Sequence, residues 1–350
     1  MIHPCGAVKW GSDPTGSFHS YLPPGCRICA TGASLVLFVT GLCQRSCFYC
    51  PLSVERKGRD LVLANESCVS HPKDILKEAW AIDAKGTGIT GGEPLIRLER
   101  VLEILALLKA ELGMAHHVHL YTGLIPSSAV LERLAQAGLD EIRLHPELDN
   151  VSAQQLYQAL REASKQGIEA GVEIPALVPS PGISDAVRRA DAFLNLNELE
   201  FSETNQEAMK SRGFCLSDDT CAAMGSRELA RTFMEDGLKV HFCSSVFKDA
   251  VQLRERLKRR AARVRRKFDE VTEDGTLIYG VVEGSIPSVT SLLQDLGVPG
   301  DLYSVTEGGL ELAAWVLEDL ASDVRRAGGS PSLVERYPLE GGLVVERIPL

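Results

Sequence analysis

The hydrophobic positions of this chain alternate between short apolar runs and longer amphipathic stretches from residue 34 onward. Short apolar runs bounded by turn residues are typical of buried strands, whereas apolar positions three or four residues apart are typical of helices. The pattern predicts strands over 35–40, 86–90, 117–121, 141–145, 170–178 and 198–202, and helices over 71–84, 97–112, 126–137, 152–165 and 184–194.

Strands that alternate with helices at this spacing favour a parallel sheet, because each helix carries the chain back to the start of the next strand. Right-handed crossovers curl such units into a sheet or barrel. The expected fold class is therefore α/β. In barrels of this type the functional groups lie at the C-terminal ends of the strands, so residues that directly follow the predicted strands are the first candidates for chemistry.

The segments on either side of these repeats differ in character. Residues 1–33 are rich in Gly, Pro, Ser and Cys without periodicity, which predicts an irregular lead-in. Beyond residue 202 we predict a flanking helix and strand over 226–235 and 240–243, a basic helix over 248–268, strands over 277–282, 333–336 and 343–348, and helices over 288–296 and 310–326. The expected boundaries are 1–33 for the lead-in, 34–243 for the repeats and flank, 244–272 for the basic helix and 273–350 for a small α/β module.

The loop after the first predicted strand carries Cys43, Cys47 and Cys50. Three thiolates on one short loop can wrap a single metal cluster. Iron–sulfur cubanes normally take four thiolates, so three leave one iron free to bind a small molecule. The spacing therefore indicates a reactive cluster rather than a purely structural one.

A second motif, Thr90-Gly91-Gly92-Glu93-Pro94, follows the second predicted strand. Its glycines allow the backbone to approach a ligand closely. Glu93 offers a carboxylate to an ammonium group. Both motifs fall at strand ends, where the barrel hypothesis places a site.

These two motifs, in this order and after these strands, resemble the radical S-adenosylmethionine (radical SAM) superfamily over roughly residues 34–205. The resemblance implies a partial (β/α)6 barrel and a [4Fe-4S] cluster held by Cys43, Cys47 and Cys50. The free iron would chelate the amino and carboxyl groups of SAM. Reduced ferredoxin or flavodoxin would supply an electron, and the resulting 5′-deoxyadenosyl radical would abstract hydrogen from a substrate in the barrel mouth. Such chemistry is oxygen-sensitive.

The same resemblance implies roles for individual residues around SAM. Tyr49 would pack near the adenine, and the Gly91-Gly92-Glu93 motif would bind the amino group. Arg143 and Glu203, at later strand ends, are predicted to contact SAM, since family members often place a basic or polar residue there. His145, Glu173 and Asn205 are weaker candidates at the same rim. No catalytic residue is assigned.

The chain contains 10 cysteines in all. Cys26 and Cys29 have a metal-knuckle spacing, and Cys243 is a candidate partner because the ends of a barrel can meet in space. The fourth ligand stays open among His241, Cys5, Cys215 and Cys221. The metal could be Zn²⁺ or an auxiliary iron–sulfur cluster. These cysteines could equally be ordinary thiols.

The formal net charge of −10 argues against a generally basic surface that coats nucleic acid. Residues 254–267 reverse this balance locally with a run of arginines and lysines. Such a helix could bind RNA phosphates or an acidic protein partner. It could also be a solvated helix neutralised by the acidic surface of the chain.

The N-terminus does not resemble a signal peptide. No apolar run approaches the length needed to span a bilayer. We therefore expect a cytoplasmic protein without membrane association. In that compartment its cysteines are thiols or metal ligands rather than disulfides.

Within the superfamily, the stretch from Gly25 to Gly58 resembles an uncharacterised archaeal-type branch related to pyruvate formate-lyase activating enzymes. Three functions remain open. The first is a radical SAM enzyme that modifies RNA or a protein side chain. The second is a radical SAM enzyme acting on a small metabolite or cofactor precursor. The third is a non-catalytic iron–sulfur binding protein, against which the intact Gly-Gly-Glu-Pro motif argues.

Overall fold

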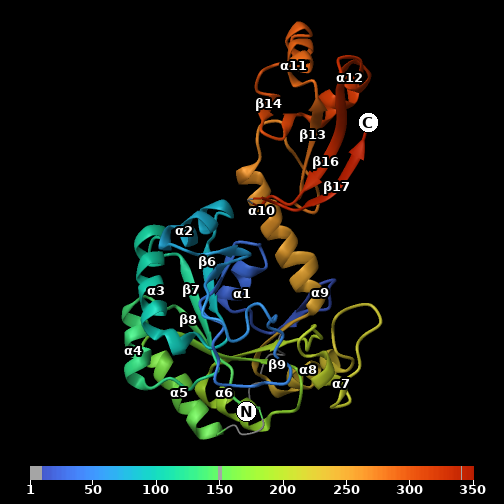
Figure 1. Ribbon diagram of the computed structural model, residues 1–350. Helices are drawn as coiled ribbons and strands as arrows, with labels where there is room; N and C mark the ends of the chain where they lie inside the picture. Colours follow the sequence, from blue (N-terminus) through green and yellow to red (C-terminus); the bar gives the residue numbers. More distant parts are fainter. Residues whose placement is uncertain (1–9, 149–151, 340) are drawn as a thin grey trace, which may run out of the picture. The chain divides into compact units, whose positions relative to one another are not determined.

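The computed structural model describes residues 10–148, 152–339 and 341–350. The chain divides into two compact units, and each is described by itself (Figure 1). The first comprises Met1–Trp80 and Ala84–Gln252, and the second comprises Ala81–Asp83 and Leu253–Leu350.

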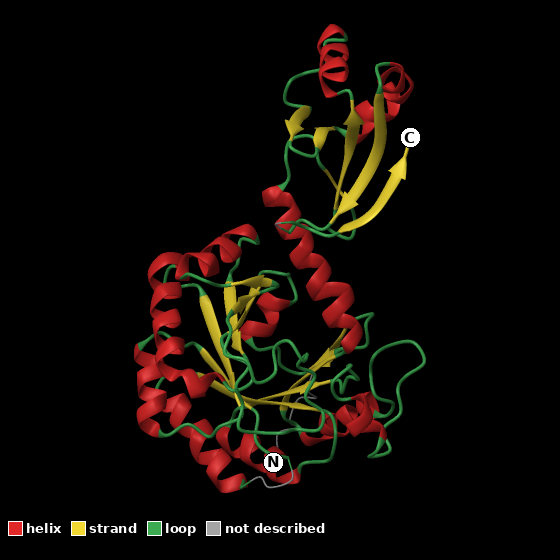
Figure 2. Ribbon diagram, in the orientation of Figure 1, coloured by secondary structure: helices red, strands yellow, loops and turns green. Residues whose placement is uncertain are grey.

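The first unit is built on one mixed sheet whose central strands are parallel (Figure 2). The parallel strands, in chain order, are β3 (Ser34–Phe38), β6 (Gly86–Thr90), β7 (His117–Thr122), β8 (Glu141–Leu144), β9 (Glu169–Pro175), β10 (Phe193–Asn197) and β11 (Lys239–Cys243). The strand predicted as a flank is thus a member of the sheet, since β11 pairs parallel with β10.

Short antiparallel strands end the sheet on both sides, so the barrel does not close. On one edge β2 (Phe18–His19) pairs with β11, and β1 (Gly11–Ser12) pairs with β2. On the other edge β4 (Leu63–Ala64) pairs with β3, and β5 (Ser67–Cys68) pairs with β4. The first unit is therefore an α/β partial barrel, as the sequence predicted.

Amphipathic helices cover the outer face of this sheet (Figure 1). They are α2 (Pro72–Ala81), α3 (Leu98–Leu112), α4 (Ser128–Gln136), α5 (Ala153–Lys165) and α6 (Pro181–Ala190). In α3 the apolar side chains of Val101, Leu105 and Leu108 are fully buried, at the three- and four-residue spacing that a core-facing helix needs. Ser127 caps α4 by accepting a hydrogen bond from the amide of Val130.

The predicted irregular lead-in contains a helix that lies inside the barrel. Helix α1 (Pro24–Cys29) packs against β3, β6 and β7, on the inner side of the sheet. The amide of Gly25 donates to the buried carboxylate of Glu141 at 3.0 Å. A Cβ on Gly25 would lie 2.6 Å from Nδ1 of His119, so only glycine fits there. The helix was missed because its six residues are too few to show periodicity.

The prediction was also wrong between residues 181 and 202. Helix α6 ends at Ala190 and β10 follows at Phe193–Asn197, before the strand predicted over 198–202. Asp191 ends the helix in the left-handed conformation with φ 55°. Glycine usually provides this stop, so an aspartate at this position is not a recognisable helix-end signal.

After β10 the chain makes a long excursion before it returns at β11. The excursion contains α7 (Gln206–Lys210), α8 (Ser226–Thr232) and the 3₁₀ turn η2 (Phe233–Asp236). Beyond β11, the short helix α9 (Ser245–Phe247) leads into a π-helical turn, η3 (Lys248–Leu253).

The second unit is a small antiparallel sheet with three helices among its described residues. It begins with the basic helix α10 (Arg254–Val264), shorter than predicted. Its strands are β12 (Glu270–Val271), β13 (Leu277–Gly284), β14 (Tyr303–Thr306), β15 (Gly309–Leu312), β16 (Gly329–Arg336) and β17 (Val344–Pro349), and its other helices are α11 (Ile286–Asp295) and α12 (Ala314–Arg326). The predicted helix over 310–326 is in fact β15 followed by α12. Val282, Leu293 and Leu317 are fully buried in the hydrophobic core of the second unit.

No helix in the described part of the chain is long and apolar enough to cross a membrane.

Candidate functional site

The C-terminal ends of the parallel strands surround a cavity of about 490 Å³ in the first unit. This volume lies within the range of small-molecule sites. Each parallel strand or the loop after it contributes to the wall, whose residues include Cys43, Cys47, Cys50, Gly91, Gly92, Glu93, Gly123, His145, Glu173, Asn197, Glu200 and Lys248. The two sequence motifs are thus brought together in one cavity.

The cluster loop, residues 41–50, presents all three of its cysteines to the cavity. Cys43 is exposed and Cys47 and Cys50 are half-buried. Burial raises the pKa of the Cys43 thiol. Among the described residues, no three His, Cys, Asp or Glu side chains are placed to hold a single metal ion. The loop therefore does not form a ready-made mononuclear site.

Arg45 ties the cluster loop to the end of β8. Its guanidinium donates to the backbone carbonyls of His145 and Pro146, the latter at 3.3 Å. A further contact reaches the carbonyl of Gly123 at 3.4 Å. The loop is thus fixed by groups other than its thiols.

The Gly-Gly-Glu-Pro motif packs directly on the cluster loop. The amide of Gly92 donates to the carbonyl of Thr40 at 2.7 Å, and the amide of Glu93 donates to the carbonyl of Leu42 at 2.8 Å. A Cβ on Gly92 would lie 2.5 Å from the Leu42 carbonyl oxygen. The glycine is therefore required by the approach of the chain's own backbone, in addition to any ligand.

A Gly92→Ala substitution should lower by about 100-fold the rate of the SAM cleavage that the family resemblance implies, because a misplacement of about 1 Å in an active site can cost that much. The added methyl group would push the cluster loop away from the end of β6. The measurement is 5′-deoxyadenosine formation by the reduced, iron-loaded protein. Gly300→Ala is the matched control, since nothing lies within 4 Å of a Cβ there. Unchanged activity in Gly92→Ala would contradict this account.

Glu93 is 2% exposed and links the ends of β6 and β7. One carboxylate oxygen accepts from the amide of Leu95 at 2.9 Å and from the hydroxyl of Thr122 at 2.7 Å. The other accepts from the amide of Gly123 at 2.7 Å. Since an ionised carboxylate has about four acceptor positions, one remains for a further donor such as an ammonium group.

Tyr49 is held at the cavity wall by His145. The two side chains meet with 3.0 Å between the Tyr49 hydroxyl and Nε2 of His145. Nδ1 of His145 lies 2.8 Å from the carbonyl oxygen of Glu173, which can only accept, so Nδ1 carries the proton and Tyr49 donates to Nε2. Burial, followed by the charge of Arg45, lowers the pKa of His145 to about 4. The imidazole is therefore neutral near pH 7 and orients the Tyr49 ring.

The excursion after β10 braces the other side of the cluster loop. The buried amide of Asn205 donates to the carbonyls of Tyr49 at 3.0 Å and of Glu200 at 2.9 Å. Phe214 stacks on Phe48 with 6.0 Å between ring centroids. Asn205 thus positions the loop backbone. Glu203 is exposed and is not on the cavity wall.

Arg143 lies below the cavity wall, inside the barrel, between two carboxylates. It contacts Glu141 at 2.6 Å and Glu173 at 2.7 Å, and it donates to the Tyr121 hydroxyl at 2.9 Å. Burial is the largest influence and opposes ionisation of both carboxyls, but the Arg143 charge and the hydrogen bonds to the carboxylates together outweigh it and hold their pKa values below the usual range. The structure places Arg143 in this ion network, and Glu173 is the member that reaches the cavity.

Several wall residues were not singled out from the sequence. Lys248 pairs with Glu200 at 2.6 Å on the cavity wall. Asn197 donates to Glu173 at 2.8 Å. Thr122 directly follows the strand predicted over 117–121, which was an available signal. Asn197 preceded the strand predicted over 198–202, and Lys248 was absorbed into the predicted basic helix.

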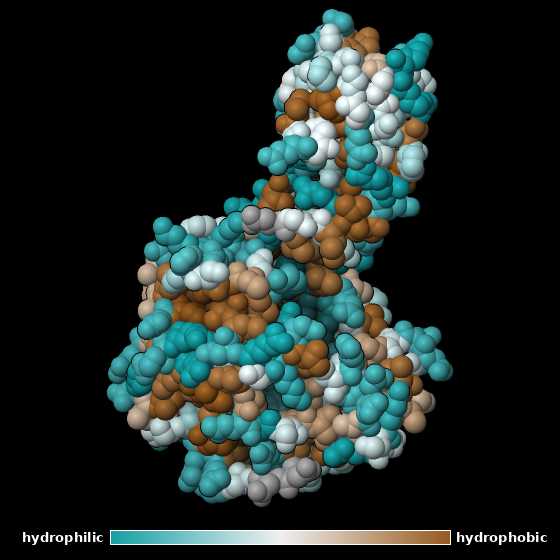
Figure 3. All heavy atoms as spheres, viewed as in Figure 1, coloured by the Kyte–Doolittle hydropathy of each residue, from teal (hydrophilic) through white to brown (hydrophobic). Residues whose placement is uncertain are grey.

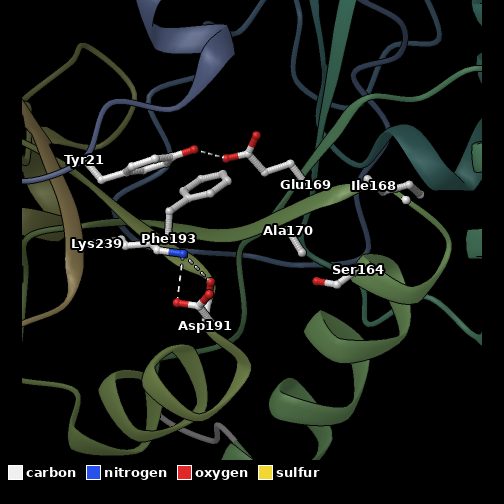
Figure 4. A pocket seen from close by; sticks show the side chains of 9 residues that line it. Tyr21, Ser164, Ile168, Glu169, Ala170, Asp191, Phe193 and Lys239 are labelled. Carbon is white, nitrogen blue, oxygen red and sulfur yellow. Dashed lines mark hydrogen bonds and ion pairs between the residues drawn. The ribbon is translucent and has the colours of Figure 1, made fainter.

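A second cavity, of about 350 Å³, lies at the opposite ends of β9, β10 and β11 (Figure 4). The charged groups drawn there are already paired: Lys239 meets Asp191 at 2.8 Å, and Tyr21 donates to Glu169. Burial and this carboxylate raise the pKa of Tyr21 to about 12. The cavity offers no unmatched charge to a ligand, so the first cavity is the candidate site.

The sequence of this chain is similar to those of known proteins that belong to one enzyme superfamily. Residues 37–179 match the radical SAM superfamily, and residues 275–350 match a domain of unknown function (DUF8061). A relative from Methanocaldococcus jannaschii is 36% identical over 354 residues, which cover 94% of this chain and 93% of that protein. It carries the provisional name glycyl-radical enzyme activating enzyme. The chain belongs to the radical SAM superfamily and is an enzyme of that type.

Two solved structures overlap part of the chain. Methylornithine synthase covers 59% of this chain and 63% of its own, with 14% identity and a TM-score of 0.41. The FeFe-hydrogenase maturase HydG of Carboxydothermus hydrogenoformans covers 49% and 46%, with 15% identity and a TM-score of 0.36. Both overlaps are partial and remote.

Proposed function

We propose that this chain binds a [4Fe-4S] cluster through Cys43, Cys47 and Cys50, binds SAM beside it, and abstracts hydrogen from a protein substrate. The observation that carries the proposal is the convergence of the three thiols and Gly91-Gly92-Glu93 on one cavity. The donor set fits the cluster, because three thiolates leave one iron for SAM. When bound, the cluster and SAM supply a 5′-deoxyadenosyl radical. Reduced ferredoxin or flavodoxin is the expected electron donor.

The residues of the chain would bind and orient SAM in this cavity. Glu93 would offer its remaining acceptor position to the SAM amino group. Tyr49, held by His145, would present its ring to the adenine. Glu173, fixed by Arg143 and Asn197, would accept from a hydroxyl or amide at the cavity floor. Lys248 and Glu200 would face the substrate from the same cavity.

The surface around the cavity favours a protein substrate. Loops that follow the strands expose large apolar side chains, namely Val54, Ile125, Val178, Leu216 and Met224. Hydrophobic patches also reach the face of this unit seen in Figure 3. Exposed apolar side chains on the loops at one end of a barrel are suited to contact with a protein. The name of the relative also refers to a protein target.

The basic helix provides weaker support for an RNA substrate than the apolar loops provide for a protein substrate. Several of its cations are matched by carboxylates within the second unit: Lys258 meets Glu255 at 3.3 Å, and Arg259 meets Asp83 at 3.0 Å. Arg266, just beyond the helix, meets Asp269 at 2.7 Å. Paired cations release fewer counterions on binding phosphates, so this segment is a poor RNA site.

The test begins with anaerobic iron–sulfur reconstitution, then dithionite reduction with SAM, with 5′-deoxyadenosine assayed by mass spectrometry. Wild-type protein should produce it. Protein, RNA and small-molecule fractions of a cell extract are then added separately. Stimulation by the protein fraction alone supports the proposal. Stimulation by the small-molecule or RNA fraction would overturn the substrate assignment, and failure to bind SAM would overturn the enzyme assignment.

A further inference from the structure

A short basic loop, residues 53–59, packs against the start of the cluster loop. The amide of Gly41 donates to the carbonyl of Arg59 at 2.8 Å. A Cβ on Gly41 would lie 1.7 Å from the carbonyl oxygen of Arg56, so only glycine allows this contact. Cys43 follows Gly41 by two residues and is exposed. The backbone of the basic loop is therefore fixed next to an exposed thiol of the proposed cluster site.

The basic loop is positive in a chain whose formal net charge is −10. It carries three cations and one carboxylate, namely Arg56, Lys57, Arg59 and Glu55. Among the described residues, no carboxylate forms an ion pair with any of these three cations. Asp60, the next residue, is already shared by two other arginines at 2.9 and 2.7 Å. The positive charge of the loop is therefore available to an incoming partner.

Two of these cations face solvent, and the third lies against the barrel. Lys57 and Arg59 are exposed, whereas Arg56 is half-buried with its guanidinium 5.9 Å from the centroid of the Phe38 ring. Lys57 also lies on the cavity wall with the three thiols of the cluster loop. Val54, in the same loop, is 59% exposed. An apolar contact with charges around it is the usual composition of a protein interface.

The proposed function requires an electron donor that approaches this part of the surface. Electron transfer slows steeply with distance, so the donor must contact the protein close to the cluster loop. Electron-transfer encounters are weak and use small interfaces, for which a single loop is large enough. Opposite charges on the two partners steer such encounters and raise association rates by about 10–10³-fold. A positive loop at this place therefore fits a donor with an acidic surface.

An RNA partner fits the basic loop less well. Three cations on one turn release few counterions from phosphates, and the remainder of the chain is acidic. Single-stranded RNA also needs exposed aromatic rings on which its bases stack. The neighbouring rings of Phe48 and Tyr49 are half-buried and pack on each other with 5.2 Å between their centroids. The observations thus favour a protein.

We propose that the basic loop docks a small acidic electron-transfer protein, which reduces the cluster held by the neighbouring cluster loop. The inference rests on the proposed function, since it assumes a cluster that must be reduced. Lys57 and Arg59 would contact carboxylates of the donor, and Val54 would supply the apolar contact. One electron passes from the reduced flavin or iron–sulfur centre of the donor to the cluster, and no bond forms or breaks.

The first test measures association of the full chain, without iron, with two purified probes by biolayer interferometry. The probes are an acidic ferredoxin and an acidic flavodoxin. For at least one of them the association rate should fall as salt is added, because salt screens exposed charges. The Arg56→Gln/Lys57→Gln/Arg59→Gln variant should lower that rate by at least about 10-fold at low ionic strength. The contacts of Gly41 with this loop involve backbone carbonyls, so these substitutions preserve them.

A matched control removes the same charge from exposed positions of α2 and α5 that are not on the cavity wall, by Lys73→Gln, Arg161→Gln and Lys165→Gln. It should associate with the probes like the wild-type protein. The second test compares 5′-deoxyadenosine formation driven by a reduced probe with formation driven by dithionite. Arg56→Gln/Arg59→Gln, which keeps Lys57 on the cavity wall, should slow the first reaction and leave the second unchanged.

The outcomes separate the docking surface from the proposed function. If dithionite yields no deoxyadenosine in the wild-type protein, the proposed function fails, whatever the probes bind. If dithionite works but neither salt nor the loop substitutions change association with either probe, only the docking surface is overturned. Tighter binding of a uridine oligonucleotide, abolished by the same substitutions, would identify an RNA surface and also overturn it. The salt dependence of the wild-type protein decides even where a variant fails to fold.

Discussion

Replacing any one of Cys43, Cys47 and Cys50 by alanine should lower 5′-deoxyadenosine formation by more than about 100-fold. Loss of an outer partner of a metal ligand already costs about 10–100-fold in affinity or activity, and loss of the ligand itself costs more. All three thiols line the cavity, so each variant removes one of the proposed cluster ligands from the same site. The measurement is deoxyadenosine yield by mass spectrometry after anaerobic reconstitution and reduction with dithionite.

The cluster loop should keep its fold in these variants, because its braces do not involve the thiols. Arg45 holds it to β8, Asn205 holds the carbonyl of Tyr49, and Thr40 accepts from the amide of Gly92. The thermal midpoint of each variant should therefore stay near that of the wild-type protein without iron. Cys68→Ala, at an exposed cysteine on β5, is the control and should retain activity. Full activity in a Cys47→Ala variant would rule out the three-thiolate site.

The repeating part of the fold was predictable because its signal is local. Strands such as β6 and helices such as α3 lie almost where periodicity placed them. The helices and helix ends that were predicted wrongly have physical causes that a local sequence pattern does not reveal. Asp191 ends α6 in a left-handed conformation that glycine usually provides. Helix α1 is too short for periodicity, and it exists because Gly25 fits against His119 and Glu141 across the barrel.

The candidate site was predictable only where its residues are close in the chain. The cluster loop and the Gly-Gly-Glu-Pro motif are contiguous, and both lie on the cavity wall. The brace from Asn205 and the pair between Lys248 and Glu200 depend on contacts across about 50 to 150 residues. The position of Arg143 also depends on partners from neighbouring strands. Such groups appear only once the sheet brings the strands together.

An Arg143→Met substitution should destabilise the first unit by about 3–5 kcal/mol, the typical cost of leaving a buried charge without its partner. Arg143 is 3% exposed and is the cation shared by Glu141 and Glu173. Without it, the carboxylate of Glu141 keeps only the amide of Gly25 and the imidazole of His117. Urea unfolding at pH 8, followed by circular dichroism, measures the change in the free energy of unfolding.

The loss of unfolding free energy caused by Arg143→Met should become smaller as the pH falls from 8 to 5. In the wild-type protein the folded-state pKa values of Glu141 and Glu173 are lowered, so their contribution is present above the unfolded value of about 4.3 and lost below it. In the variant, the hydrogen bonds to the two carboxylates remain, but burial is no longer opposed by the Arg143 charge and both pKa values rise. Its folded state then gains stability on protonation while the wild-type does not. Combining Arg143→Met with Glu141→Gln and Glu173→Gln should recover part of the stability. A loss below about 1 kcal/mol that does not change with pH would mean that water, not Arg143, compensates these carboxylates.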